Sequence, residues 1–596
     1  MNGKSKVRYI WFLISPYWKH GKLYMVIAIL MAALFQPISA VLSTLLPQRA
    51  IDGVVQGQST EQIITVVALF TLFIAIINVL QSTISKVYTQ LAQTKINYKI
   101  IREVNEKALH TDYKYYDNPE FYNEFSYAQQ NYSSNAGQAA SIVPQLIQAV
   151  VTALAMGTII AQAGAVLLVV VLVYVLLQTL LTLPQTKINA DFSVTSNDLK
   201  RPISYIYRTV LQKESAAEMR SSAAGEKLLG TFTTVMNSYI FEFRKYLRKL
   251  LKFSIPQSLI STVQGSIILL FIVIFVIDGD TSKIGLYASL TLAAGILSSN
   301  ISSVFGIITQ LYQLTLYGER IARFFETESV IEPRNSDASA APKGQYCVEF
   351  NDVSFEYEES TFGVQSLNLK IPAGGRIAII GENGAGKSTI MKLLLRLFDV
   401  DGGSIRINGQ DLRDYDIHSL RRKIGVAYQD VRILSMSLRD VLTAYNDVSD
   451  EKLADIMKKL GLHKVLDRID GNFDTMVSRE FTEDGVVLSG GEAQRIALAR
   501  LFTGSFGLLL LDEPNSALDP ISEHKLMNLI LDKANTATTI MVAHRLSIVR
   551  DFDVIYHMEH GKIIECGSHD ELMDARGKYY DMFTRQAENY QYENVS

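Results

Sequence analysis

The sequence predicts an α-helical domain with six membrane spans, residues 1–326, then a linker, residues 327–345, and an α/β P-loop domain, residues 346–596. Three observations predict this division. The first part has long uncharged apolar runs, the last part alternates short apolar strands with helical stretches, and "EPRNSDASAAPKG" between them is polar and rich in small residues. A chain of 596 residues also exceeds the roughly 250–300 residues of one core.

Six segments have the length of a membrane span, about 20 mostly apolar residues. They are Leu23 to Leu46, Ile63 to Leu80, Ile142 to Ile160, Ala165 to Leu183, Ser258 to Ile277 and Ile284 to Tyr312. A buried helix of a soluble core is the alternative for each one. Six such segments with consistent flanking charge favour the membrane.

The flanking charge predicts the topology, because Lys and Arg collect on the cytoplasmic side. Basic residues precede the first span and fill the long loops after spans two and four, whereas the other loops carry almost none. Both termini are therefore expected in the cytoplasm. The tips of the long loops, Tyr115 to Phe125 and Ala216 to Leu228, are predicted to form short transverse helices that dock on another domain; solvated turns are the alternative.

Neutral polar and aromatic residues replace ionisable ones inside the spans, where a charge would cost about 2.5–3.5 kcal/mol. They either join helices or line a cavity suited to an amphiphilic or peptide-like cargo. The set comprises Gln36, Asn78, Gln145, Gln148, Tyr174, Gln178, Gln264, Ser298, Ser299, Asn300, Ser303 and Gln310.

The composition excludes two classes of function. A formal net charge of −3 argues against a nucleic-acid partner, which requires a basic surface. The two cysteines, Cys347 and Cys566, are too far apart in sequence to form a thiol metal motif, and we interpret them as reduced structural thiols.

The clearest chemical motif is G-x-x-x-x-G-K-S, from Gly381 to Ser388, between an apolar strand and an amphipathic helix. This is a P-loop in its required context. Its glycines let backbone N–H groups surround phosphates, Lys387 reaches the β and γ phosphates, and Ser388 holds Mg²⁺. The predicted nucleotide-binding residues are Gly381, Glu382, Asn383, Gly384, Ala385, Gly386, Lys387, Ser388 and Thr389.

Two further apolar strands end in polar residues. "LLLLDEP" places Asp512 to support Mg²⁺ and Glu513 to polarise an attacking water; a helix-capping carboxylate is the alternative for Glu513. "TTIMVAHRLS" ends at His544, which is expected at the γ phosphate because ligands bind at the carboxyl ends of parallel strands.

A second anion site is predicted about a hundred residues after the first. In "LSGGEAQRIALAR", Ser489, Gly490 and Gly491 precede a helical pattern and expose backbone N–H groups at its N-terminus. An ordinary helix cap is the alternative.

Together these motifs resemble those of ATP-binding cassette (ABC) transporters, and the order of the domains resembles a half-size exporter. The resemblance covers nearly the whole chain and implies ATP and Mg²⁺ as cofactors and ATP hydrolysis coupled to transport. It assigns adenine stacking to Tyr357 in "VSFEY", contact with Mg²⁺ and a catalytic role to Gln429 in "GVAYQD", and the D-loop to Asp519 in "SALD".

The resemblance also explains the second anion site. Two cassettes meet head to tail in this family, so Ser489, Gly490, Gly491 and Glu492 would clamp the nucleotide bound to another chain. The partner is then a second copy or a related half-transporter. Two departures from the family pattern are Glu492, where Gln is commoner, and the longer segment around Thr482, which puts the coupling contacts in doubt.

The expected function is ATP-driven export of a peptide or an amphiphilic secondary metabolite across a bacterial inner membrane. A multidrug pump and a lipid flippase remain as alternatives. A membrane-anchored ATP-dependent regulator or channel, which does not pump, is an alternative from another class.

Overall fold

The computed structural model describes residues 3–161, 165–277, 284–329, 331, 339–357, 363–443, 448–514, 520–543 and 545–593; most of the "EPRNSDASAAPKG" linker lies outside this set. The chain forms two compact units. One comprises Met1–Thr111 and Asn118–Glu328, and the other comprises Asp112–Asp117 and Ser329–Ser596. Six residues of the first long loop predicted to be cytoplasmic therefore belong to the second unit.

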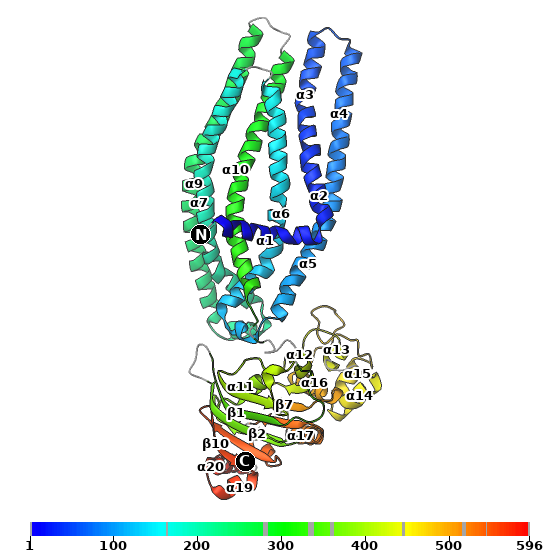
Figure 1. The fold of residues 1–596 in the computed structure, drawn as a ribbon, viewed down its shortest axis with the longest axis vertical. Coiled ribbons are helices and arrows are strands. Elements are labelled where there is room, and N and C mark those ends of the chain that lie inside the picture. The colour runs from blue at the N-terminus through cyan, green and yellow to red at the C-terminus, as the bar shows by residue number, and fades with distance from the viewer. Residues whose placement is uncertain are drawn as a thin grey trace. The chain divides into compact units, whose positions relative to one another are not determined.

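The first unit is entirely helical where it is described (Figure 1). Two π-helical turns, η1 and η2, interrupt the first long helices without ending them. The elements are α1 (Gly3–His20), α2 (Lys22–Leu30), η1 (Met31–Phe35), α3 (Gln36–Val55), α4 (Thr60–Thr83), η2 (Ile84–Thr89), α5 (Gln90–Leu109), α6 (Pro119–Ala161), α7 (Ala165–Leu211), α8 (Lys213–Ser221), α9 (Ala224–Ile277) and α10 (Ile284–Glu326).

Helix α1 crosses the other helices of this unit (Figure 1) and was not predicted from the sequence. Phe12 stacks on Tyr132 of α6 with 5.5 Å between ring centroids, and Arg8 forms a 2.8 Å ion pair with Glu326 of α10. Trp11 is 59% exposed. A basic, aromatic helix lying across a bundle is typical of a helix in the membrane interface.

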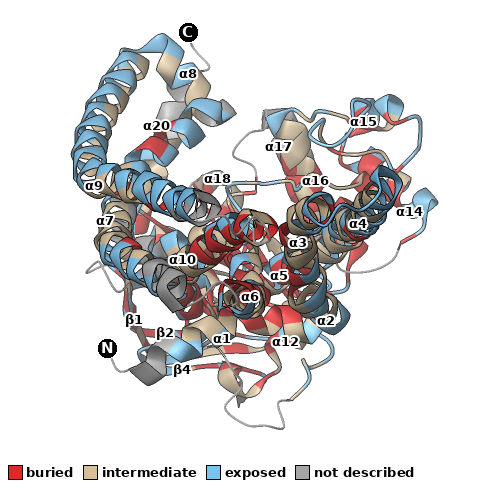
Figure 2. Cartoon of the chain, turned by 90° about the horizontal axis from the view of Figure 1, so that it is seen from above, coloured by how far each residue is buried: buried red, intermediate tan, exposed pale blue. Residues whose placement is uncertain are grey.

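Much of α4 is exposed (Figure 2), and many exposed residues of the long helices are apolar. Leu69, Phe73 and Val79 are all exposed, which is costly in water and favourable in lipid. Among the described residues, four helices are long and apolar enough to cross a membrane: Lys22–Val55, Thr60–Leu109, Phe121–Ala161 and Ile284–Glu326. The other two predicted spans lie on α7 and α9, where several side chains are not described.

Part of the predicted polar set joins helices instead of facing a cavity. Gln264 is buried and donates to Ser298 Oγ at 3.3 Å, linking α9 to α10. Gln178 is buried and donates to the carbonyl oxygen of Gln257 at 3.1 Å, linking α7 to α9. For these three predicted residues, the helix-joining interpretation is confirmed.

The second unit contains two sheets. A four-stranded antiparallel sheet has the order β2-β1-β4-β5, and a six-stranded sheet has the order β10-β9-β3-β8-β7-β6 with only the β9–β10 pair antiparallel. The strands are β1 (Val348–Glu356), β2 (Gly363–Ile371), β3 (Arg376–Gly381), β4 (Gly402–Ile407), β5 (Gln410–Asp411), β6 (Ile424–Ala427), β7 (Leu508–Asp512), β8 (Thr538–Val542), β9 (Val554–Glu559) and β10 (Lys562–Gly567).

Helices pack around the six-stranded sheet (Figure 1). The P-loop begins at the end of β3, and Asp512 is at the end of β7. β3 is central, as expected for the strand that leads into a P-loop, and β7 is buried at every residue. The remaining elements are η3 (Tyr113–Asp117), α11 (Lys387–Leu394), η5 (Leu412–Asp414), α12 (Ile417–Arg421), α13 (Leu438–Leu442), α14 (Asp450–Lys459), α15 (His463–Arg468), α16 (Gly490–Thr503), α17 (Pro520–Ala534), α18 (Leu546–Val549), α19 (His569–Ala575) and α20 (Lys578–Glu593).

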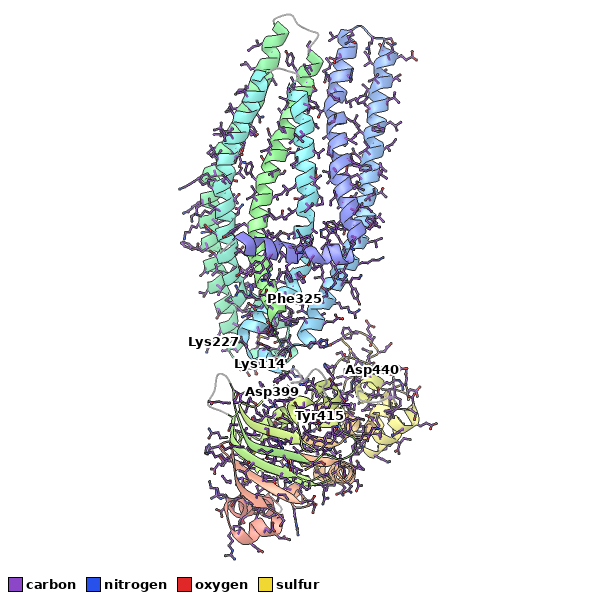
Figure 3. All side chains as sticks on the ribbon, in the orientation of Figure 1. Lys114, Lys227, Phe325, Asp399, Tyr415 and Asp440 are labelled. Atoms are coloured by element: carbon purple, nitrogen blue, oxygen red, sulfur yellow. The ribbon has the colours of Figure 1, made fainter. Side chains whose placement is uncertain are left out.

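Buried side chains fix the loops of this unit. Tyr415, labelled in Figure 3 with Asp399, is 3% exposed and donates its hydroxyl to the carbonyl oxygen of Ile407 at 2.9 Å. Both cysteines are free thiols.

Candidate nucleotide half-site

The P-loop joins β3 to α11, in the strand–loop–helix order that the sequence predicts. Gly381 has φ +146°, and a Cβ there would lie 2.2 Å from the carbonyl oxygen of Met558. Gly384 and Gly386 also have positive φ, +86° and +98°. Only glycine adopts all three conformations without strain, so the loop can bring its N–H groups close to phosphates.

Lys387 is 6% exposed, and its Nζ donates to the carbonyl oxygens of Gly381 at 2.8 Å and Glu382 at 2.9 Å. Burial lowers the pKa of Lys387, while Glu513 and Asp512 act in the opposite direction. A buried ammonium with only two neutral acceptors suits a phosphate, which can replace these carbonyl groups as a charged partner.

Two predicted Mg²⁺ ligands, Ser388 at the start of α11 and Asp512 at the end of β7, lie beside this lysine. Ser388 Oγ donates to Asp512 Oδ2 at 3.1 Å, and Asp512 is 8% exposed at the end of β7. A hydroxyl and a carboxylate are oxygen ligands of the kind that Mg²⁺ prefers. When bound, the metal would neutralise charge on the β and γ phosphates.

Glu513 is held beside Gln429, whose Nε2 donates to Glu513 Oε2 at 3.1 Å. The backbone of Glu513 has φ +45°, an uncommon conformation for a side chain of this size, and its N–H donates to the carbonyl oxygen of Val542. Such conformations cluster at functional sites because the surrounding structure must enforce them.

Tyr357 lies at the same end of the unit. Its hydroxyl is 3.4 Å from Thr389 Oγ1 of α11, and its ring makes edge contacts with Phe355 at 4.9 Å and Phe398 at 5.4 Å. An aromatic ring beside Thr389, in the first turn of α11, is well placed to stack on a nucleotide base.

The signature segment caps α16. Ser489 Oγ accepts the N–H of Glu492 at 3.4 Å, and Glu492 Oε2 accepts the N–H of Ser489 at 2.8 Å, which is a capping box. Arg468 adds a 2.6 Å bond to Glu492. Burial raises the pKa of Glu492, but these hydrogen bonds outweigh it and lower the pKa overall. Glu492 therefore supports the helix end.

Among the described residues, the hydrogen bonds of the signature stay within its own helix end and Arg468. Within the described part of the chain, none of the hydrogen bonds of Ser489 or Glu492 reaches the P-loop, and Ser489 and Gly490 remain exposed. The structure thus brings together Tyr357, the P-loop, Gln429, Asp512 and Glu513, and leaves the second anion site elsewhere. Asp519 and His544 lie outside the described residues.

Comparisons with known proteins agree with this geometry. Residues 364–516 match the family model described as "ABC transporter". A putative multidrug export ATP-binding/permease protein of Bacillus subtilis is 40% identical over 241 residues, which cover 40% of this chain and 41% of that protein. The chain thus matches about two fifths of this relative's length.

Two other comparisons extend beyond the cassette. An ATP-dependent lipid A-core flippase of Saccharophagus degradans is 28% identical over 400 residues, covering 66% of each protein. A solved structure of a bacterial Atm1-family ABC exporter with ATP bound has a TM-score of 0.76 and 22% identity, and covers 95% of this chain and 98% of that chain.

These findings and the assembled half-site agree with the resemblance that the sequence motifs carry. The chain has an ATP-binding cassette, whose cofactors are ATP and Mg²⁺, preceded by membrane-type helices. Residues 364–516 are similar to ABC transporters, and the chain has the fold of a bacterial ABC exporter.

Proposed function

We propose that the protein exports a peptide or an amphiphilic secondary metabolite across a bacterial inner membrane, driven by ATP hydrolysis in a homodimer. The observation that carries the ATP-driven part is the half-site: Lys387, Ser388, Asp512, Gln429 and Glu513 meet at one sheet edge. Glu513 accepts a proton from the attacking water, and Lys387 holds the phosphates.

A polar stripe on α10 supports the cargo class. Ser299, Ser303, Gly306, Gln310 and Gln313 recur at helical spacing on one side of α10, and the first three are exposed. A Cβ at Gly306 would meet nothing within 4 Å. Uncharged polar groups along a spanning helix suit a cargo with both amide or hydroxyl groups and apolar surface.

The separation of the two anion sites supports a homodimer. The signature N-terminus at Ser489 is exposed and does not reach the P-loop of its own chain, so a second copy can supply it. A related half-transporter is the alternative partner. ATP then closes two cassettes around two nucleotides, and hydrolysis reopens them. Both termini lie in the cytoplasm.

A lipid flippase is the second candidate. The match to a protein named as a lipid A-core flippase is longer than the cassette, so it includes part of the membrane unit. The relative named as a multidrug exporter matches over a length that the cassette alone can supply, and therefore says less about the cargo.

Reconstitution tests the proposed function. The purified protein in lipid nanodiscs is assayed for ATPase stimulation by peptides, amphiphilic drugs and lipids, with Glu513→Gln as the blank. Inside-out vesicles then measure uptake of the stimulating compound. We expect stimulation and ATP-dependent uptake for peptides or amphiphilic metabolites. Stimulation by lipids alone identifies a flippase, and ATP hydrolysis without flux of any class contradicts export.

A Gln310→Leu variant separates cargo binding from ATP hydrolysis. It lengthens the apolar surface of the α10 stripe and leaves the cassette unchanged. We expect weaker cargo stimulation and unchanged basal ATPase; Leu292→Ile, on an exposed position of the same helix, is the control.

A further inference from the structure

Tyr357 shares an aromatic cluster with the first cytoplasmic loop. Phe398 lies between two tyrosines, with its ring centroid 5.4 Å from Tyr357 and 5.7 Å from Tyr113, and both pairs meet edge to face at 83°. Tyr113 is the first residue of η3 and belongs to the same compact unit as the cassette. One buried phenylalanine thus contacts both the expected base-stacking ring and the loop.

A single lysine lies over all three rings. Lys392 Nζ is 5.3 Å from the Tyr357 centroid, 5.8 Å from Tyr113 and 6.0 Å from Phe398. Lys392 is on α11, five residues after Lys387. Cation–π attraction depends on the position of the cation over each ring face. If one ring moves and Lys392 follows it, the attraction of Lys392 to the other two rings changes.

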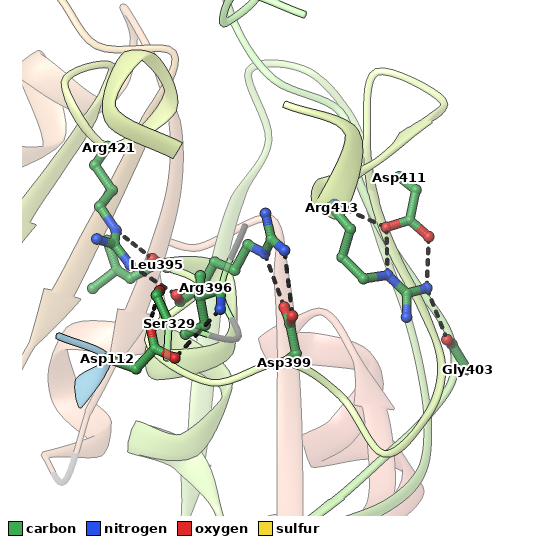
Figure 4. A network of polar contacts seen from close by, with 10 residues as sticks. Asp112, Ser329, Leu395, Arg396, Asp399, Gly403, Asp411, Arg413 and Arg421 are labelled. Atoms are coloured by element: carbon green, nitrogen blue, oxygen red, sulfur yellow. Dashed lines mark hydrogen bonds and ion pairs between the residues drawn. The ribbon is translucent and has the colours of Figure 1, made fainter. Parts of the chain in front are cut away.

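The loop is fixed next to this cluster by Asp112. Asp112 is 6% exposed and accepts hydrogen bonds from Ser329 Oγ at 2.5 Å and from the N–H of Ile331 at 3.3 Å. Figure 4 shows Asp112 beside Leu395 and Arg396, whose carbonyl oxygens accept 2.9 Å and 2.8 Å bonds from Arg421. The residue before Tyr113 is therefore tied to the linker at the end of α11.

The chain connects this cluster directly to the membrane helices. η3 follows α5, which ends at Leu109, and precedes α6, which begins at Pro119. Both helices belong to candidate spans, Thr60–Leu109 and Phe121–Ala161. A displacement of Tyr113 is thus applied to two spans through only a few residues.

We propose that Tyr113, Phe398 and Lys392 form a base-sensing contact that reports the nucleotide base on Tyr357 to the first cytoplasmic loop. These are positioning residues, because none of them touches the reacting phosphates. The proposal rests on the proposed function and deepens it: the response of the membrane helices depends on the base as well as on the phosphates. A nucleotide with a pyrimidine base, which has a smaller stacking face than adenine, then causes a smaller response of the membrane helices.

The test measures the conformation of the full-length protein in nanodiscs. Cys347 and Cys566 are replaced by Ser, and Gln56→Cys at the exposed end of α3 carries a spin label, so the distance between the labels of two copies reports the membrane helices. Glu513→Gln retains the nucleotide. At saturating nucleotide we expect ATP to move several-fold more dimers to the nucleotide-bound label distance than CTP does.

Variants of the cluster separate sensing from binding. Tyr113→Leu removes an exposed ring and is expected to lower the ATP response to the CTP level, with ATP affinity within about twofold of the parent. Tyr113→Phe keeps the ring and is expected to restore the response. Lys392→Met, which keeps the side chain's length without its charge, is expected to resemble Tyr113→Leu.

The outcomes distinguish this proposal from the proposed function. Equal responses to ATP and CTP in the parent, or a full ATP response in both Tyr113→Leu and Lys392→Met, overturn base sensing while leaving export intact. A parent that binds ATP but shows no nucleotide-dependent change in distance overturns both.

Discussion

Replacing Glu513 by Gln is expected to lower ATP turnover by about 10²- to 10⁴-fold while ATP still binds. Glutamine has nearly the same size and can still accept the hydrogen bond from Gln429, which is 3.1 Å in the structure. It cannot accept a proton from water. Nucleotide-dependent dimer closure should therefore persist and become long-lived.

Phosphate release and retention of labelled ATP measure the two parts of this prediction. Glu451→Gln, on an exposed position of α14, is the matched control and is expected to turn over ATP normally. Turnover by Glu513→Gln at the control's rate would remove Glu513 from its proposed role.

Replacing Lys387 by Met is expected to weaken ATP binding by roughly 10- to 100-fold, because a hydrogen bond to a charged group is worth about 1.5–3 kcal/mol. Lys387 is buried against Gly381 and Glu382, and methionine fills similar space without a charge. The fold should survive, since the exchange removes a desolvated ammonium.

Equilibrium binding of a fluorescent ATP analogue checks this expectation. Lys458→Met, an exposed lysine on α14, controls for the loss of one positive charge. Equal affinity in the two variants would contradict the role of Lys387 as a phosphate ligand.

The strand–loop–helix of the P-loop and the buried strand before Glu513 could be predicted from sequence because their residues come in short motifs with fixed spacing. The glycines from Gly381 to Gly386 require positive φ values that only they adopt freely, and Asp512 follows a strand whose continuous apolar run signals burial. Local patterns like these do not depend on contacts between distant residues. The strand–loop–helix and the buried strand could therefore be predicted from the sequence alone.

Contacts between distant residues could not be predicted in the same way. Tyr113, Phe398 and Tyr357 come from three separate segments, and no periodicity relates them. The position of η3 in the cassette unit depends on Asp112 and its bonds to Ser329 and Ile331, which are more than two hundred residues away. The sequence predicted that the loop tip docks on another domain. It did not predict that Asp112 anchors the loop, or that Tyr113 shares an aromatic cluster with Tyr357.

The polar residues of the membrane helices show a second limit of prediction from sequence. Gln178, Gln264 and Ser303 have the same character in sequence, yet the first two are buried in bonds between helices and the third is exposed. A neutral polar residue serves either purpose, and only the packing of neighbouring helices decides. Helix α1 was missed because its charges were interpreted only as flanks of the first span.

The most direct measurement of the central claim, that two chains complete each nucleotide site, is complementation between two inactive variants. Lys387→Met disables a P-loop. Gly490→Asp, at an exposed position where a Cβ meets nothing within 4 Å, places a negative charge at the signature. Each variant alone is expected to be inactive.

Coexpression of the two variants, followed by an ATPase assay of the whole dimer population, gives the result. If sites form between chains, each mixed dimer has one intact site, and activity should return to about one quarter of that of the parent with random pairing. If each chain forms its own site, every site carries a defect. Activity no higher than that of the separate variants would then contradict the account.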